Sequence, residues 1–339
     1  MPRRKRATIR EVAQATGLSP AAVSYALRGL QTSEDTQARV RRAAAELGYE
    51  ADPIARALAG GRSGLVGVLC GSLEDLGEQR FVEIVGRQLH TRDLQILVTD
   101  AHGDPTRERS LARQLADRRV DGLIVSPLDP SHEFWGELSE AIPVVAVGDA
   151  LTRAVTAGEL IFENRRGVSE MLHHLHALGH RRITVLTPSR PSTPDRPSER
   201  VVAEVSGELG IEARIVNSPH SVDGATAVAA RVLAELPRPT ALFCLSDSIA
   251  CGVYPAARSV GLRIPEDLSV AGYDDHPIAR VLTPELTSVA WGATGVARMA
   301  ADLMGDAIAG EATPRRLLVA PTLAPRGSTG PRGELVEGA

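Results

Sequence analysis

The chain has 339 residues, of which 43% are hydrophobic and 24% charged, so it has the composition of a globular protein with room for two or three domains. No apolar run is long enough to span a membrane, no apolar segment follows the basic N-terminus as in a signal peptide, and the cysteines Cys70, Cys244 and Cys251 are too widely spaced for a disulfide framework or a metal site. The net charge is −4, but residues 1–62 carry eleven Lys and Arg against six Asp and Glu, which leaves −9 on residues 63–339. A basic head on an acidic body indicates that one module binds phosphate.

The first predicted elements are two short helices joined by a tight turn, over residues 8–29. Thr8 fits the start of a capping box, and Gly17 suits a left-handed turn residue because it has no Cβ. Ser19 can cap the second helix, with Pro20 at its first position, where no N–H is needed. A helix pair of this shape presents its second helix to the major groove of DNA. The pattern therefore predicts a DNA-binding head.

A third helix is predicted over residues 33–48, with Ser33 as its cap and Gly48 just past its end. Residues 54–59 are too few to form a stable helix alone, and the glycine-rich residues 60–64 are typical of a linker. The head and the rest of the chain are thus expected to be separate units.

After the linker, short apolar strands alternate with amphipathic helices. The predicted strands are 65–69, 94–98, 122–125, 143–147, 183–186, 213–216, 241–245 and 269–272. The predicted helices are 81–90, 106–118, 168–177, 198–209, 223–235 and 248–260. Such alternation predicts doubly wound parallel sheets. The segment is too long for one sheet, so two lobes with a ligand cleft between them are expected.

Several short motifs accompany the helix pair in a fixed order: Asp52–Leu58, Val120–Ile124, Leu178–Ile183, Pro239–Phe243, Ile264–Asp275 and Leu282–Pro284. This set resembles the LacI/GalR family of bacterial transcriptional regulators, from Thr8 to about Thr329. The resemblance implies an N-terminal all-α helix-turn-helix head and an α/β periplasmic-binding-protein-like core of two doubly wound parallel-sheet lobes. It further implies that the core dimerises and binds a small molecule between its lobes.

In that fold the chain crosses between the lobes three times, and the resemblance places these crossings near Ile161, Ala290 and Val319. We therefore expect the following divisions: a head over 1–50, a hinge helix and linker over 51–62, an N-lobe of 63–161 with 292–319, a C-lobe of 162–290 with 320–330, and a disordered tail over 331–339.

In the family, outward-facing residues at the start of the second helix read bases, and the resemblance places Pro20, Ala21 and Tyr25 there. Pro20 and Ala21 can offer only apolar contact, for example to a thymine methyl group. Tyr25 is the best candidate for a base reader, and packing against a neighbouring helix is its alternative role. We expect phosphate contacts from the nearby polar residues Thr8, Ser19, Ser24 and Arg28.

Residues 54–59 resemble the hinge helix of the family, with Ile54, Ala55 and Leu58 as expected DNA contacts. The segment is expected to become helical only in the dimer on DNA, where Leu58 would wedge into the minor groove and kink the operator. The alternative is a linker leucine that rests on the body. Two heads on a two-fold dimer imply a pseudo-palindromic operator.

The resemblance places effector contacts in loops that follow strand ends: Arg80, Phe81, Asn164, Arg200, Asp247, Asp275 and Trp291. Of the adjacent pair Asp274 and Asp275, the second is expected to face the cleft, and loop capping is the alternative role of these acids. Arg80 and Arg200 favour an anionic or strongly polar effector, since Arg pairs well with anions. The effector is thus expected to be a sugar, a nucleoside or an anionic metabolite.

The function predicted from these features is that of a cytoplasmic, dimeric repressor of transcription controlled by a small molecule. A regulator that has lost effector control is one alternative, and an α/β enzyme with a nucleic-acid-binding tail is another. The sequence holds no G-x-G-x-x-G or G-x-S-x-G motif, so neither an enzyme nor a cofactor is expected. The histidines at 173, 174, 176 and 180 have no cysteine or carboxylate to complete a metal site, and structural roles are expected for them.

Overall fold

The chain divides into two compact units, Met1–Ser63 and Gly64–Ala339, each described here by itself. The computed structural model describes residues 7–27, 29–49, 62–188, 197–311 and 313–332. Four predicted DNA contacts, Arg28, Ile54, Ala55 and Leu58, lie outside the described residues.

Three helices form the first unit: α1 (Ile9–Thr16), α2 (Pro20–Leu27) and α3 (Glu34–Leu47). The capping box predicted at Thr8 is present, and Gly17 adopts the left-handed conformation with φ of 68°. Apolar side chains from all three helices form its core: Val12, Ala13, Val23, Ala26, Val40 and Ala44. The helices α1 and α2 thus form the predicted helix-turn-helix.

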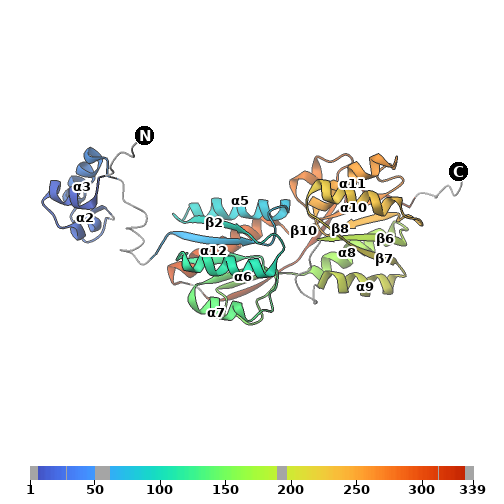
Figure 1. Cartoon of the computed structure of the whole chain (residues 1–339), viewed down its shortest axis with the longest axis horizontal. Coiled ribbons are helices and arrows are strands. Elements are labelled where there is room, and N and C mark those ends of the chain that lie inside the picture. Colours follow the sequence, from blue (N-terminus) through green and yellow to red (C-terminus); the bar gives the residue numbers. More distant parts are fainter. Residues whose placement is uncertain (1–6, 28, 50–61, 189–196, 312, 333–339) are drawn as a thin grey trace. The chain divides into compact units, whose positions relative to one another are not determined.

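The second unit holds two six-stranded sheets (Figure 1). The first has the strand order β11-β5-β4-β3-β1-β2 and is parallel throughout. Its strands are β1 (Leu65–Cys70), β2 (Gln95–Asp100), β3 (Gly122–Val125), β4 (Val144–Gly148), β5 (Gly158–Phe162) and β11 (Arg315–Val319). We call this sheet and its helices the first lobe.

The second sheet has the order β12-β10-β9-β8-β6-β7, and β12 is antiparallel to β10 at one edge. Its strands are β6 (Arg182–Pro188), β7 (Glu212–Ser218), β8 (Ala241–Cys244), β9 (Ser269–Asp274), β10 (Thr287–Ala290) and β12 (Thr322–Ala324). We call this sheet and its helices the second lobe.

Helices cover both faces of each sheet. Those of the first lobe are α5 (Leu76–His90), α6 (Pro105–Asp117), α7 (Phe134–Ala141) and α12 (Ala293–Ala309). Those of the second lobe are α8 (Asn164–Ala177), α9 (Pro197–Leu209), α10 (Val222–Ala234) and α11 (Asp247–Ser259). Parallel strands buried on both faces explain the near-continuous apolar runs in the sequence. None of these described helices is both long and apolar enough to cross a bilayer.

Two helices begin earlier than the sequence pattern predicts. Helix α5 starts at Leu76 because the Asp75 side chain accepts hydrogen bonds from the backbone N–H groups of Gly77 and Glu78. Its apolar face starts only near Phe81, so hydrophobic periodicity misses the first turn. Helix α8 likewise begins at Asn164, four residues before its predicted start. Both early turns contribute residues to the site described next.

Candidate functional site

The outward face of α2 is built from small and apolar side chains. Pro20 and Ala21 are exposed, Ser24 is half-buried, and Tyr25 is 39% exposed, while Val23 and Ala26 point into the core. The exposed part of α2 therefore offers few side-chain hydrogen-bonding groups to DNA.

The hydroxyl groups expected to hold phosphates already make local contacts. Thr8 Oγ1 lies 3.0 Å from a Glu11 carboxylate oxygen, to which it donates. Ser19 Oγ accepts from the N–H of Ala22 at 3.1 Å, which leaves its own proton available to a phosphate oxygen. Ser19 therefore fits the expected role more directly than Thr8.

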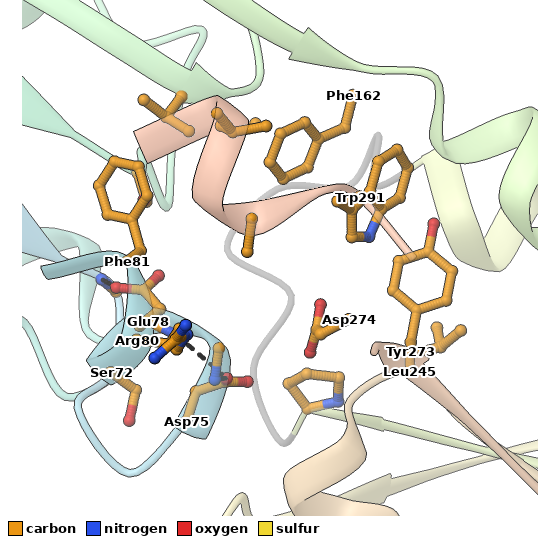
Figure 2. A pocket seen from close by; sticks show the side chains of 18 of the residues that line it. Ser72, Asp75, Glu78, Arg80, Phe81, Phe162, Leu245, Tyr273, Asp274 and Trp291 are labelled. Carbon is orange, nitrogen blue, oxygen red and sulfur yellow. Dashed lines mark hydrogen bonds between the residues drawn. The ribbon is translucent and has the colours of Figure 1, made fainter. Parts of the chain in front are cut away.

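A cavity of about 1350 Å³ lies in the second unit, lined by residues of both lobes. Five of the seven predicted effector contacts line it: Arg80, Phe81, Asn164, Asp275 and Trp291. Figure 2 shows that side chains of the first lobe, among them Phe81 and Glu78, face Tyr273 and Asp274 of the second lobe. A cavity of this size between two lobes can enclose a small metabolite.

Aromatic rings form one wall of the cavity. Phe162 stacks on Trp291 with ring centroids 4.5 Å apart and an interplanar angle of 15°, and Tyr273 lies 5.3 Å from Trp291 in a tilted arrangement. The Tyr273 hydroxyl donates to Asn164 Oδ1 at 3.0 Å. These contacts hold the rings in place and give the cavity a firm apolar surface.

Asp274, rather than its neighbour, presents a carboxylate to the cavity. Both aspartates line it, but Asp275 forms ion pairs with Arg326 and, at 3.5 Å, with Arg280. The Asp274 side chain points into the cavity in Figure 2, and burial together with the nearby charge of Asp75 raises its pKa well above the usual value. Asp275, the one of the two expected to face the cleft, does line the cavity, but its carboxylate is already paired with Arg326.

Glu78 adds a second carboxyl group with an altered pKa. Burial raises the pKa of Glu78 to about 8, the Asp75 charge adds to this, and hydrogen bonds with Cys70 and the Gly71 N–H oppose it. The Gly71 N–H donates to Glu78 Oε2 at 3.1 Å. At neutral pH Glu78 is therefore mostly protonated and can donate a hydrogen bond.

Asp75 joins the two lobes at one edge of the cavity. Its Oδ2 accepts from Ser246 Oγ at 3.0 Å and lies 2.9 Å from His220 Nδ1, although that nitrogen is not aligned for a directed hydrogen bond. Close by, the Leu76 N–H donates to Ser248 Oγ at 2.8 Å. Burial alone would raise the pKa of Asp75, but His220, the Ser246 hydroxyl and the Gly77 N–H outweigh it and lower that pKa. We call these contacts the interlobe latch.

The latch predicts that Ser248→Ala favours separation of the lobes. The change leaves the Leu76 N–H without its partner across the interface, which costs about 1 kcal/mol. We expect a larger radius of gyration by small-angle X-ray scattering and a lower urea midpoint. Ser259→Ala is the control, since its hydroxyl bonds only within α11, to Ala256 O at 2.8 Å. Unchanged scattering from Ser248→Ala would count against the latch.

The other two predicted effector contacts do not line the cavity. Asp247 is 1% exposed, and its carboxylate accepts from Ser288 Oγ and from the His276 N–H, both at 2.7 Å. Arg200 points to solvent and lies 3.8 Å from Glu204. Sequence reasoning placed Asp247 after a strand and matched Arg200 to a ligand-binding arginine of the family, but it could not show which way the two side chains turn.

Sequence reasoning missed Asp75, Glu78 and the histidines His220 and His276, and it considered Asp274 only as the less favoured of two aspartates; all five line the cavity. Asp75 carried a usable signal, because Asp is a preferred helix cap, but no apolar periodicity followed it closely enough to reveal the helix.

A helix-turn-helix unit followed by two parallel α/β sheets that enclose a cavity defines a DNA-binding regulatory protein with a lac repressor-like fold. The comparisons agree. Residues 8–52 match the family described as bacterial regulatory proteins, lacI family, and residues 172–329 match the periplasmic binding protein-like domain.

Similar proteins extend over most of the chain. The HTH-type transcriptional repressor PurR of Serratia proteamaculans is 29% identical over 289 residues, which cover 84% of this chain and 85% of that protein. The ribose operon repressor of Haemophilus influenzae is 28% identical over 291 residues, 84% and 86% of the two chains. The lac repressor dimer bound to operator and the anti-inducer ONPF has a TM-score of 0.82 at 24% identity, covering 96% and 100%. The chain belongs to the lacI family of bacterial transcriptional regulators, which are not enzymes.

Proposed function

We propose that this regulator is a cytoplasmic repressor that binds a pseudo-palindromic operator as a homodimer, and that a small molecule in the cavity sets its operator affinity. The observation that carries the proposal is the presence of both parts in one chain: a basic helix-turn-helix unit and a cavity of about 1350 Å³ lined from two lobes. We also propose the domain limits 1–50, 51–62, 63–161 with 292–319, and 162–290 with 320–330.

The DNA contacts proposed on the head are those on the exposed face of α2, with Tyr25 as the base reader and Ser19 as a phosphate contact. Pro20 and Ala21 offer no side-chain hydrogen bond, so direct readout is sparse. Specificity then also depends on DNA deformability and half-site spacing. Leu58 remains the proposed minor-groove wedge.

The names of the relatives support this proposal without fixing the effector. PurR and the ribose operon repressor are repressors, and the lac repressor dimer is seen on operator with an anti-inducer. In the present chain, ligand binding in the cavity and DNA binding by the head would bias the same two-state equilibrium, so each changes the affinity of the other by the same factor. The sign depends on which state the ligand prefers.

Operator binding by the Tyr25→Ala variant tests the proposal. We expect the wild-type protein to form a sequence-specific complex in gel shifts that survives moderate salt, and Tyr25→Ala to weaken it about tenfold or more, as for loss of one base contact. Leu47→Ala is the control, since Leu47 is 43% exposed but lies at the end of α3. Binding that does not distinguish DNA sequences would refute the proposed function. Equal losses of operator affinity in the two variants would show that Tyr25 is not a base reader.

A further inference from the structure

We propose that the ligand of the cavity is a small organic cation, an amine or ammonium compound whose charged group lies beside Asp274 and whose apolar part contacts the aromatic wall. This inference rests on the proposed function, since it names the ligand class of the same cavity. It replaces the expectation of an anionic effector, which depended on Arg80 and Arg200.

Carboxyl groups outnumber basic side chains in the lining of the cavity. Six carboxyl groups line it, namely Glu74, Asp75, Glu78, Asp149, Asp274 and Asp275, against two arginines, Arg80 and Arg280. Each arginine has an acidic partner: Arg80 lies 3.7 Å from Glu83, and Arg280 lies 3.5 Å from Asp275. Arg200 is outside the lining. The arginines therefore do not form a free anion site.

The histidines of the lining do not reverse this balance. His220 lies beside Asp75, and His102 Nδ1 lies 3.0 Å from Asp100. Burial lowers the pKa of His276, and the nearby Arg80 charge lowers it further, so His276 is neutral at pH 7. Within the described part of the chain, no cationic side chain forms an ion pair with Asp274.

Asp274 is the group that a ligand cation would satisfy. The charged groups that raise its pKa are all carboxyls, Asp75, Asp247 and Glu78, while a backbone hydrogen bond from Asp247 lowers it. Its backbone has φ of 110°, which is rare for a residue with a Cβ and is typical of functional positions. A positive charge within hydrogen-bonding distance would stabilise the ionised carboxylate strongly in this partly enclosed site.

The aromatic wall suits the rest of such a ligand. Trp291 and Tyr273 lie next to Asp274 at the same side of the cavity in Figure 2, and Phe162, which also lines the cavity, stacks on Trp291. Aromatic faces attract ammonium groups and the carbon atoms attached to them. A carboxylate beside aromatic rings is thus complementary to a cation with an apolar body. An anionic ligand would add negative charge among these carboxyl groups, and a neutral one would not stabilise the ionised form of Asp274.

Two sets of matched compounds test the charge directly by calorimetry on the full-length protein. Tyramine, tyrosol and 4-hydroxyphenylacetate share a ring and differ in charge, as do glucosamine, glucose and glucuronate. We expect a cation to bind most tightly within at least one set. Its binding should release protons at pH 7, since it lowers the pKa of Glu78 and Asp274, so the measured heat should vary with the ionisation enthalpy of the buffer.

Variants complete the test. Asp274→Asn should weaken the cation at least about tenfold and leave a neutral member nearly unaffected, whereas Asp223→Asn, an exposed residue of α10 outside the cavity lining, should change little. Tighter binding of a neutral or anionic member, no effect of Asp274→Asn, or failure of both cations at millimolar concentration would overturn the inference. If glucose or glucuronate then alters operator binding, only the charge assignment fails. If no sequence-specific operator complex forms either with or without these compounds, the proposed function fails instead.

Discussion

The His180→Leu variant is expected to lose about 3 kcal/mol or more of unfolding free energy, because one buried imidazole connects three parts of the second lobe. His180 is 2% exposed. Its Nδ1 lies 2.9 Å from Thr240 Oγ1, and its Nε2 lies 2.9 Å from Ser269 Oγ and 3.1 Å from the Gly330 carbonyl. Leucine fills the space but removes the three contacts of the ring, and the two hydroxyls then donate only through the weaker hydrogen bonds of Thr240 Oγ1 to the Arg182 carbonyl and of Ser269 Oγ to the Gly330 carbonyl.

The protonation state of His180 adds a dependence on pH. The Gly330 carbonyl can only accept, so Nε2 carries a proton and Nδ1 accepts from Thr240 in the neutral ring. Burial lowers the pKa of His180, and the nearby charges of Arg332, His174 and Arg181 lower it further. The hydrogen bond to the Gly330 carbonyl raises this pKa, but it does not outweigh burial. The unfolded chain therefore binds more protons below about pH 6.5 than the folded one, and stability falls as the pH drops below that value.

Urea denaturation at pH 8 and pH 5.5 measures both effects. Wild type should be less stable at the lower pH, and His180→Leu should lose part of that difference. His173→Ala is the control, because His173 is exposed on α8 and contacts only Ser169 of its own helix. We expect it to change stability by less than about 0.5 kcal/mol. Similar losses in both variants would show that the buried contacts of His180 are not what stabilises the lobe.

Most of the fold could be predicted from the sequence because it depends on local patterns. The helix pair has its caps within a few residues, and buried parallel strands such as β1 and β8 are short apolar runs between turns. Elements without such a pattern were missed. The strand β5 begins at a glycine, and β11 has exposed arginines at its start, so neither resembles a buried strand until it pairs with its neighbour.

The cavity was predictable in position but not in chemistry. Strand ends and family motifs pointed to the right loops, and Phe81, Asn164 and Trp291 do line the cavity. Arg326 pairs with Asp275, which lies 51 positions away in the sequence, and this pairing leaves Asp274 as the aspartate available to a ligand. Such long-range pairing decides the charge of the site, and no local pattern reveals it.

Asp247→Ala is expected to lower the unfolding free energy by about 2 to 4 kcal/mol and to disturb the ligand site indirectly. The Asp247 carboxylate joins the start of α11 to β10 through Ser288 and to the loop after β9 through the His276 N–H. That loop begins with Asp275 and directly follows Asp274, the last residue of β9. Gly272 packs so closely against Asp247 that even a methyl group at position 272 would collide with the carboxylate.

The Asp247→Asn variant separates the hydrogen bonds from the charge. Burial raises the pKa of Asp247 to about 7, and the nearby charge of Asp275 contributes to the increase. The hydrogen bonds from Ser288 and the His276 N–H lower the pKa, but they do not outweigh burial. Because this folded-state value lies above the usual one near 3.8, the contribution of Asp247 to stability is fully present below about pH 4 and is lost as the pH rises through 7. Asparagine keeps the shape and is always neutral, so Asp247→Asn should gain in stability relative to wild type from pH 5 to pH 8.

Asp223→Asn on the neighbouring helix is the matched control, since Asp223 also lies in a first helical turn but is exposed. Chemical denaturation at the two pH values should show no comparable trend for it. Ligand calorimetry decides between the two roles considered for Asp247. A residue that touches the ligand would lose affinity in the asparagine variant even where stability is unchanged. A residue that only positions the loop after β9 would lose affinity in Asp247→Ala and retain it in Asp247→Asn, which is the outcome that the buried position of Asp247 predicts.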